Sequence, residues 1–233
     1  MTNILVIIPA YNEQENIVKL IEKLLGLPLS MDILVVDDGK DNTEALINEL
    51  RTRNPNLFLI KREGKFGRGS AVLVGLKFGL EKDYEYLVEM DADFSHEPAE
   101  LPRLMEKASP DGVVIGSRYV RGSRIENWPI KRRIFSRFAN FYAELVLGIG
   151  IHDYTNGYRV YGRKAIKKLD FKKIKSTGYI VLSEISYQLF RKNVPFTECP
   201  SLFVNRSRGG SNFSLKEIKE AFTAVWKIKK ANA

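Results

Sequence analysis

The chain has 233 residues, enough to bury one good hydrophobic core, and nothing in its length requires a second domain. Its charged and apolar fractions are ordinary for a globular protein, and the absence of repeats and long low-complexity tracts excludes the repeat and disordered classes. Lysine and arginine exceed aspartate and glutamate by 37 − 28 = 9, so we expect an anionic partner: nucleic acid, an anionic lipid surface or a phosphorylated substrate.

Cysteine content and the start of the chain indicate the cellular setting. Cys199 is the only cysteine, which excludes an intramolecular disulfide, and no Cys/His cluster has zinc-site spacing. The apolar run at residues 4–10 is shorter than a signal-peptide core, and no stretch approaches the roughly 20 apolar residues of a membrane span. We therefore expect a soluble, cytoplasmic chain that is not integral to a membrane.

The first half of the chain alternates short β-branched runs with amphipathic helical patterns. Strands are predicted at residues 4–8, 33–36, 57–60, 86–90 and 113–115, and helices at residues 17–25, 42–53 and 69–80. Strands separated by helices are joined by right-handed crossovers. The pattern therefore predicts an α/β fold whose mainly parallel, Rossmann-like sheet is covered by helices on both faces.

Polar residues follow four of the predicted strands. Ligands of such sheets bind beyond the carboxyl ends of the strands. A turn or a helix cap explains any one Asp or Asn at a strand end, but four polar strand ends in one chain favour a ligand site. These ends are Pro9-Ala10-Tyr11-Asn12-Glu13, Asp37-Asp38, Asp91-Ala92-Asp93 and Gly116-Ser117-Arg118.

Asp91 and Asp93 are the candidate metal ligands. They lie two residues apart directly after a predicted strand, so in extended backbone both carboxylates would project to the same side and reach one cation. Carboxylate oxygens suit Mg²⁺ or Mn²⁺, which proteins hold by one or two carboxylates while substrate phosphates complete the shell. A lone D-x-D pattern is weak evidence for a metal site. Its position after the fourth predicted strand, where a nucleotide diphosphate would lie, strengthens this interpretation.

Two segments of the second half have apolar residues at helical spacing among basic residues. Core packing explains such stripes, and so does a membrane surface; both interpretations stay open. The first stripe comprises Ile134, Phe135, Phe138, Phe141, Tyr142, Leu145, Val146 and Ile149, with Lys131, Arg132, Arg133 and Arg137 at its start. The C-terminal segment places Leu215, Ile218, Phe222, Val225 and Trp226 on one side among lysines.

Seven motifs, in order, resemble those of family 2 glycosyltransferases of the dolichol-phosphate (polyprenol-phosphate) mannose synthase type. D-x-D is common to many family 2 enzymes, whereas the later motifs are far narrower, and the set covers nearly the whole chain. The motifs are PAYNEQENI, VVDDGKDNT, MDADFSHEP, GSRYVRG, WPIKRRIFSRFAN, DYTNGYRVY and FVNRSRGGS.

This resemblance implies a GT-A type nucleotide-sugar-binding fold in a single catalytic domain, residues 1–233. Residues 1–120 would form the nucleotide-sugar-binding half, residues 121–212 the acceptor-side half and residues 213–233 a C-terminal amphipathic helix. The implied reaction is inverting transfer of mannose from GDP-mannose to dolichyl or polyprenyl phosphate, with Mg²⁺ or Mn²⁺ as cofactor. The product would donate mannose in protein or glycan glycosylation.

The resemblance also assigns residues to the donor. The nucleoside would be held by Pro9, Tyr11, Glu13, Val36 and Asp38, and the diphosphate, through the metal, by Asp91, Ala92 and Asp93. Arg118 and Arg206 would face phosphate, which suits a guanidinium that stays charged at any working pH. Asp91, Asp93 and Arg118 would be the catalytic residues.

The acceptor phosphate, by the same resemblance, would be held by Arg132 and Ser136 together with Arg118 and Arg206. Arg132 and Ser136 lie one helical turn apart, so they can converge on one phosphate. A lipid acceptor favours an interfacial interpretation of both basic amphipathic helices. We therefore expect peripheral association with the cytoplasmic face of an anionic membrane, or else attachment through a small membrane-anchoring subunit.

Rival functions stay open at this point. A UDP-sugar such as UDP-glucose could be the donor for the same acceptor, and a basic nucleic-acid-binding protein is the alternative of another class. We expect no nucleic-acid partner, because no nucleic-acid module is recognised. The glycine-rich run at residues 64–69 is interpreted as a strand-to-helix turn near the donor, and His96 as a structural residue. Ser95 as a third metal ligand stays an open question.

Overall fold

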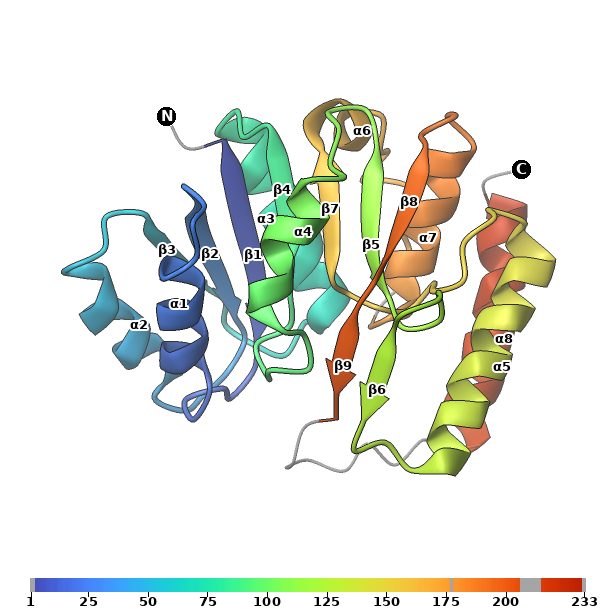
Figure 1. Ribbon diagram of the computed structural model, residues 1–233, viewed down its shortest axis with the longest axis horizontal. Coiled ribbons are helices and arrows are strands. Elements are labelled where there is room, and N and C mark those ends of the chain that lie inside the picture. Colours follow the sequence, from blue (N-terminus) through green and yellow to red (C-terminus); the bar gives the residue numbers. More distant parts are fainter. Residues whose placement is uncertain (1–2, 177, 206–214, 232–233) are drawn as a thin grey trace.

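The computed structural model of the chain describes residues 3–176, 178–205 and 215–231 (Figure 1). Its strands are β1 (Ile4–Ala10), β2 (Asp32–Asp37), β3 (Leu57–Lys61), β4 (Tyr86–Glu89), β5 (Val113–Ser117), β6 (Arg124–Glu126), β7 (Arg159–Gly162), β8 (Phe196–Pro200) and β9 (Leu202–Val204). Its helices are α1 (Ile17–Leu25), α2 (Thr43–Arg51), α3 (Arg68–Glu81), α4 (Leu101–Met105), α5 (Ile130–Leu147), α6 (Arg163–Lys167), α7 (Ile180–Phe190) and α8 (Leu215–Ala231), with a 3₁₀ turn at Pro98–Glu100.

The central sheet has the strand order β3-β2-β1-β4-β7-β5-β8. Only β7 runs against its neighbours, pairing antiparallel with both β4 and β5, while the other pairs are parallel. This confirms the predicted mainly parallel α/β sheet. A small parallel pair, β6 and β9, lies beyond the carboxyl end of β8, because β9 continues the direction of that strand after one residue.

Helices cover both faces of the sheet (Figure 1). Leu5 and Ile7 of β1 pack in a core that includes residues of α3, α5, α7 and α8, whereas Val6 and Ile8 pack against α1, α2 and α4. Side chains alternate between faces along a strand, so a strand buried on both faces reads as a continuous apolar run. This is why the run at the start of the chain predicted β1 correctly.

Strand β7 is one of several elements after β4 that the hydrophobic pattern did not predict, together with α4, β6, α6, α7, β8 and β9. It begins at Arg159, which is fully buried. The guanidinium of Arg159 donates to the carbonyl oxygens of Asn156 at 2.8 Å and Tyr154 at 2.9 Å and to Ser186 Oγ at 2.7 Å. A buried charge is tolerated only because of these hydrogen bonds, which a hydrophobic pattern in one sequence does not reveal.

Strand β1 also ends later than expected, at Ala10, whereas the strand was predicted at residues 4–8. The parallel register with β2 continues through Pro9 and Ala10, and the Ala10 carbonyl accepts the N–H of Asp38 at 3.0 Å. The ladder therefore carries Tyr11 and Asp38 to the same edge of the sheet.

Helix α5 has two apolar faces. Ala143, Val146 and Leu147 are buried in the core shared with α8. A second stripe stands in solvent along the helix, and it consists of Ile130, Ile134, Phe138, Phe141 and Leu145, which are 55–72% exposed. Core packing therefore explains only one side of α5. We call the five exposed residues the α5 stripe.

Helix α8 lies beside α5 (Figure 1) and contacts both α5 and α7. Val225 and Ile228 are buried in the core, whereas Trp226 is half exposed. Successive helix positions differ by about 100° in direction, so the expectation that Val225 and Trp226 share one side was wrong. Leu215, Ile218 and Phe222 lie outside the described side chains. Within the described residues, no helix is long and apolar enough to cross a membrane.

Candidate active site

A cleft of about 310 Å³ opens at the carboxyl edge of β1, β2 and β4, where strand ends place ligands in α/β sheets. Most of the predicted donor residues line it: Pro9, Tyr11, Glu13, Asp38, Asp91, Ala92 and Asp93. The turn before α3 contributes Lys65 and Gly67, as expected from the glycine-rich run, and Arg68 and Tyr179 complete the wall. The structure thus brings residues from three of the four predicted strand ends, those after β1, β2 and β4, into one cavity, whereas residues 116–118 do not line it.

Val36 is not at the cleft. It is fully buried in β2, an inner strand covered by helices on both faces, and it packs in the core with Leu34 and Ile7. A side chain in this position points into the sheet–helix interface rather than past the strand end. The structure therefore places the Val36 side chain in the core, and a contact between Val36 and a nucleoside stays a prediction.

Asp38 lines the cleft, and its carboxylate accepts hydrogen bonds from other residues of the chain. Arg62 donates to both of its carboxylate oxygens, at 2.6 and 2.7 Å, and the backbone N–H of Phe66 donates to Oδ2 at 3.0 Å. This bidentate pair ties the end of β2 to the turn that precedes α3. Asp38 therefore shapes the cleft wall by holding that turn in place.

The segment from Asp91 to Asp93 is a turn and not extended, which corrects the expected geometry. The N–H of Ser95 donates to Asp93 Oδ1 at 3.1 Å, an Asx-type contact that favours a turn. The N–H of Asp91 donates to His96 Nδ1 at 3.2 Å, and His96 Nε2 lies 2.9 Å from Asn156 Oδ1. Because Nδ1 accepts, Nε2 carries the proton and donates to Asn156. His96 is thus a buried structural residue, as predicted.

The paired aspartates fit a hard divalent cation. Both line the cleft, and carboxylate oxygens are the ligands that Mg²⁺ and Mn²⁺ prefer. No group of three or more His, Cys, Asp or Glu side chains with metal-site geometry occurs within the described residues, so a diphosphate would have to supply further ligands. Ser95 is buried, and its Oγ has no hydrogen-bond partner in the described part of the chain. The metal role of Asp91 and Asp93 stays a prediction.

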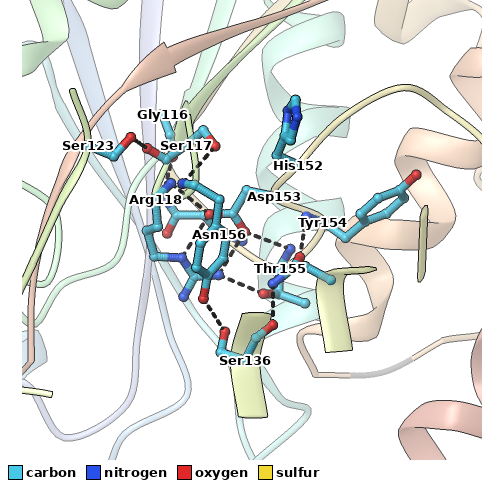
Figure 2. Close-up of polar contacts among 12 residues, drawn as sticks. Gly116, Ser117, Arg118, Ser123, Ser136, His152, Asp153, Tyr154, Thr155 and Asn156 are labelled. Carbon is cyan, nitrogen blue, oxygen red and sulfur yellow. Dashed lines mark hydrogen bonds and ion pairs between the residues drawn. The ribbon is translucent and has the colours of Figure 1, made fainter. Parts of the chain in front are cut away.

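Arg118 forms a buried ion pair with Asp153 (Figure 2). Its Nε and Nη2 donate to the two carboxylate oxygens at 2.8 and 2.7 Å, and Nη2 also donates to Thr155 Oγ1 at 2.7 Å. Its Nη1 makes no hydrogen bond to any residue that the structure describes. Arg118 is only 8% exposed. Asp153 therefore fixes the guanidinium through one edge, and any phosphate would meet the other.

The charges of this pair depend on one another. Burial opposes ionisation of Asp153, but the charge of Arg118 and the hydrogen bonds that it donates hold the pKa of Asp153 below its ordinary 3.8. Burial likewise opposes the charge on Arg118, but the charge of Asp153 and the hydrogen bond to its carboxylate, with smaller contributions from Tyr119 and Tyr179, together raise the pKa of that guanidinium. The depressed pKa means that the pair stabilises the fold above the unfolded-state pKa. This stability is lost as the pH falls through the folded-state pKa.

Arg118, Arg132 and Ser136 come together around two aromatic residues. The guanidinium carbons of Arg118 and Arg132 lie 5.5 and 4.9 Å from the ring centroid of Trp128. The hydroxyl of Tyr119, next to Arg118, donates to Ser136 Oγ at 2.7 Å. The structure therefore collects the predicted acceptor residues into one cluster at the start of α5.

Arg206, the remaining predicted phosphate contact, lies outside the described residues. Its neighbour Asn205 accepts a hydrogen bond from Arg132 Nη1 at 3.1 Å and pairs through its N–H with the carbonyl of Glu126. The chain therefore leads from β9 to the acceptor cluster just before Arg206.

Sequence reasoning assigned no individual role to four residues at or beside the site: Asp153, Arg62, Arg68 and Tyr179. Asp153 stands first in the motif DYTNGYRVY, and membership of this narrow motif was the available signal. Arg62 precedes the glycine-rich run at residues 64–69 and Arg68 lies within it, and this run fits neither the dinucleotide fingerprint nor the P-loop spacing. Their partners, Asp38 and Asp91, lie more than 20 residues away, and one sequence gives no pairing over that separation.

The mainly parallel sheet with paired aspartates at a cleft is the GT-A-like fold of glycosyltransferases. The family described as "Glycosyl transferase family 2" matches residues 5–170, and the chain belongs to this family. It is accordingly a glycosyltransferase, as the sequence motifs predicted.

Three relatives are similar over nearly the whole chain. The "Polyprenol monophosphomannose synthase" of Mycolicibacterium smegmatis is 40% identical over 230 residues, covering 97% of this chain and 87% of that protein. The "Undecaprenyl-phosphate mannosyltransferase" of Micrococcus luteus is 36% identical, covering 95% of this chain and 92% of the relative. The "Dolichol-phosphate mannosyltransferase" of Pyrococcus furiosus is 32% identical, covering 97% of this chain but 63% of the relative.

Solved structures share the fold at low identity. The glucosyl-3-phosphoglycerate synthase of Mycobacterium tuberculosis, solved with Mn²⁺, UDP and glucosyl-3-phosphoglycerate, superposes with a TM-score of 0.67 at 18% identity. The match covers 99% of this chain and 80% of that one. At this identity the likeness establishes the fold alone.

Proposed function

We propose that this chain transfers mannose from GDP-mannose to a polyprenyl or dolichyl phosphate, with inversion and with Mg²⁺ or Mn²⁺. The observation that carries the proposal is the closeness of two chemically distinct sites. The ring of Phe203 lies 6.1 Å from that of His96, which holds the Asp91 turn, and 5.2 Å from the guanidinium carbon of Arg118. His96 and Phe203 thus link the turn that carries the paired aspartates to the arginine cluster.

The names of the relatives support mannose as the transferred sugar and a lipid phosphate as the acceptor. Each of the three names mannose transfer to a polyprenol-type lipid carrier, and two name its phosphate explicitly as the acceptor. In this chain the cleft would take the nucleotide diphosphate sugar, with Asp91 and Asp93 near the diphosphate. The arginine cluster would take the acceptor phosphate. The UDP found in a structural neighbour makes a UDP-sugar the main competing donor.

A phosphate acceptor removes the need for a general base. A phosphate monoester has a second pKa near 6, so at neutral pH it is mostly a dianion. One of its oxygens would form a bond to the anomeric carbon as the bond to the diphosphate breaks on the opposite face, which inverts the configuration. Arg118, Arg132 and Ser136 would orient that oxygen. A bound divalent cation would neutralise charge on the departing diphosphate.

Arg132→Ala is expected to weaken acceptor use and to leave donor affinity within a few-fold. The substitution removes one charge-assisted contact, about 1.5–3 kcal/mol, from the acceptor cluster only. Transfer to a short-chain polyprenyl phosphate and calorimetric affinity for GDP-mannose should be measured on the same preparation. Arg53→Ala is the control, since Arg53 is exposed just after α2 and its guanidinium pairs with Glu49 at 3.5 Å, away from the acceptor cluster.

Two outcomes would contradict this assignment. One is an Arg132→Ala protein that loses donor binding but keeps its response to acceptor. The other is wild-type protein that uses free polyprenol as readily as its phosphate, which would require a base that the proposal does not include.

The α5 stripe supports attachment to a membrane surface. Its five apolar residues follow one another at intervals of three or four positions, so they form one face of the helix. Lys131, Arg133 and Arg137 are exposed on the same helix, and cations near an anionic leaflet favour binding by about 1 kcal/mol each. We propose that this face lies on the cytoplasmic leaflet beside the lipid acceptor. A small anchoring subunit is not required by this proposal.

The chain is expected to float with vesicles rich in anionic lipid, and less as salt is raised. Phe141→Glu combined with Leu145→Glu should reduce binding at least about tenfold, because two apolar side chains no longer enter the interface. Ala45→Glu with Thr52→Glu, exposed positions on and just after α2, changes the net charge equally and should bind far better than the α5 variant. Wild-type protein that stays in solution at low salt would instead indicate an anchoring partner.

A further inference from the structure

Arg68, the first residue of α3, lies against the predicted metal-binding turn. Its Nε donates to Asp91 Oδ1 at 2.6 Å, and its Nη1 lies 2.7 Å from Glu89 Oε1. Glu89 is fully buried, and the side chain of Arg68 is only 13% exposed. The guanidinium thus bridges the last residue of β4 and the first aspartate of the pair.

The position of this guanidinium is fixed by its neighbours on two further elements. A Cβ atom at Gly157 would lie 1.8 Å from Arg68 Nη2, so only glycine leaves room for the side chain there. On another side, the ring of Tyr179 lies 5.2 Å from the guanidinium carbon. These neighbours restrict the Arg68 side chain to one orientation. Its hydrogen bond then restricts the orientation of the Asp91 carboxylate.

We propose that Arg68 is a positioning residue that holds the carboxylate of Asp91 in the orientation needed to bind a divalent cation together with a nucleotide diphosphate. This inference rests on the proposed function, because it takes the cleft to be the donor site. Arg68 holds one carboxylate oxygen of Asp91, Oδ1, by a hydrogen bond. This contact also fixes the direction in which the second oxygen, Oδ2, points. Arg68 acts through Asp91 and not by contact with the donor.

If Arg68 positions Asp91, its loss should reduce the extent to which the metal raises nucleotide affinity. Without metal, a positioning residue for Asp91 has little effect on how nucleotide binds. With metal, loss of Arg68 lets Asp91 rotate, so the metal contributes less. A residue that touched the phosphates directly would instead weaken nucleotide binding in both conditions.

Lys65 is the matched control. It lines the same cleft and carries the same charge, but its Nζ lies over the ring of Tyr11, 4.3 Å from the centroid, and it makes no contact with Asp91. Lys65→Met therefore removes a cation from the cleft while leaving the bridge between Glu89 and Asp91 intact. Its effect on nucleotide affinity should be similar with and without metal.

Calorimetry with GDP and with UDP, each in EDTA and in excess Mn²⁺, tests the proposal on wild type, Arg68→Met and Lys65→Met. For Arg68→Met we expect metal-free affinity within threefold of wild type and a metal-dependent gain reduced at least tenfold. Since Arg68→Met leaves the Glu89 carboxylate buried beside no cation, Arg68→Met/Glu89→Gln is measured in parallel as a variant without that charge. Thermal unfolding verifies that each variant is folded.

The outcomes separate this proposal from the proposed function. If Mn²⁺ fails to raise wild-type affinity for either nucleotide, the metal-dependent donor site itself is refuted and the role of Arg68 with it. If wild type gains affinity and both Arg68 variants keep the full gain, only the positioning role is overturned. If the variants lose affinity equally in EDTA and in Mn²⁺, Arg68 contacts the nucleotide directly and the positioning role is again overturned.

Discussion

Asp93→Ala is expected to fold as wild type does and to lose sugar transfer by at least about a hundredfold, because removing one fixed electrostatic partner of a transition state has effects of this size. Asp93 is partly exposed at the cleft, so its loss leaves no buried cavity. Initial rates with GDP-mannose and polyprenyl phosphate should be compared at saturating Mn²⁺. The same samples should be examined by circular dichroism to establish that the fold is unchanged.

Asp111→Asn provides the control for this substitution. Asp111 is an exposed aspartate whose Oδ2 lies 3.6 Å from Lys164 Nζ, away from the cleft lining. Its replacement should leave the rate unchanged. Near-normal turnover of Asp93→Ala in chelated, metal-free buffer would show that the paired aspartates do not hold a catalytic metal.

Asp153→Asn is expected to lower the free energy of unfolding by about 3–5 kcal/mol, because it leaves the buried charge of Arg118 without its partner. Arg118 and Asp153 are 8% and 0% exposed, so water cannot replace the lost carboxylate. Asp153 also accepts the backbone N–H groups of Arg118, Thr155 and Asn156, which fix the loop before β7. Urea denaturation at pH 7 measures the loss.

Two comparisons test the cause of that loss. Asp111→Asn, which breaks an exposed ion pair, should change stability by no more than about 0.5 kcal/mol. The difference between wild type and Asp153→Asn should also shrink as the pH is lowered below the ordinary aspartate pKa of 3.8, since protonation removes the same charge. A loss of under about 1 kcal/mol at pH 7 would contradict a buried, coupled pair.

The first half of the fold could be predicted from sequence because its signals are local. β1, β2 and β3 are apolar runs bounded by polar turns, and α1 has its buried residues, among them Ile17, Leu20 and Leu24, at helical spacing. β7 could not be predicted, because its place between β4 and β5 depends on pairing across more than 40 residues. In addition, β7 begins with Arg159, and an arginine in a sequence normally indicates an exposed position, although this one is buried.

The candidate site was predicted in its residue types but not in its internal partners. Tyr11, Asp38, Asp91 and Asp93 do reach one cleft, because parallel strands end at the same edge. Motif resemblance placed Val36 there too, yet the covering helices bury it. Side-chain pairs such as Arg118 with Asp153 arise from tertiary packing, and no local pattern encodes them.

The most direct test of the central claim is transfer of labelled sugar by the purified chain to polyprenyl phosphate in the presence of Mn²⁺. GDP-mannose and UDP-glucose should be supplied in parallel, with free polyprenol as the acceptor control, and the lipid product identified by mass spectrometry. The account predicts polyprenyl phosphate mannose from GDP-mannose, no product from polyprenol and little from UDP-glucose. A glucosylated lipid phosphate formed faster than the mannosylated one would contradict the proposed donor, and sugar transfer only to a hydroxyl acceptor would contradict the proposed function itself.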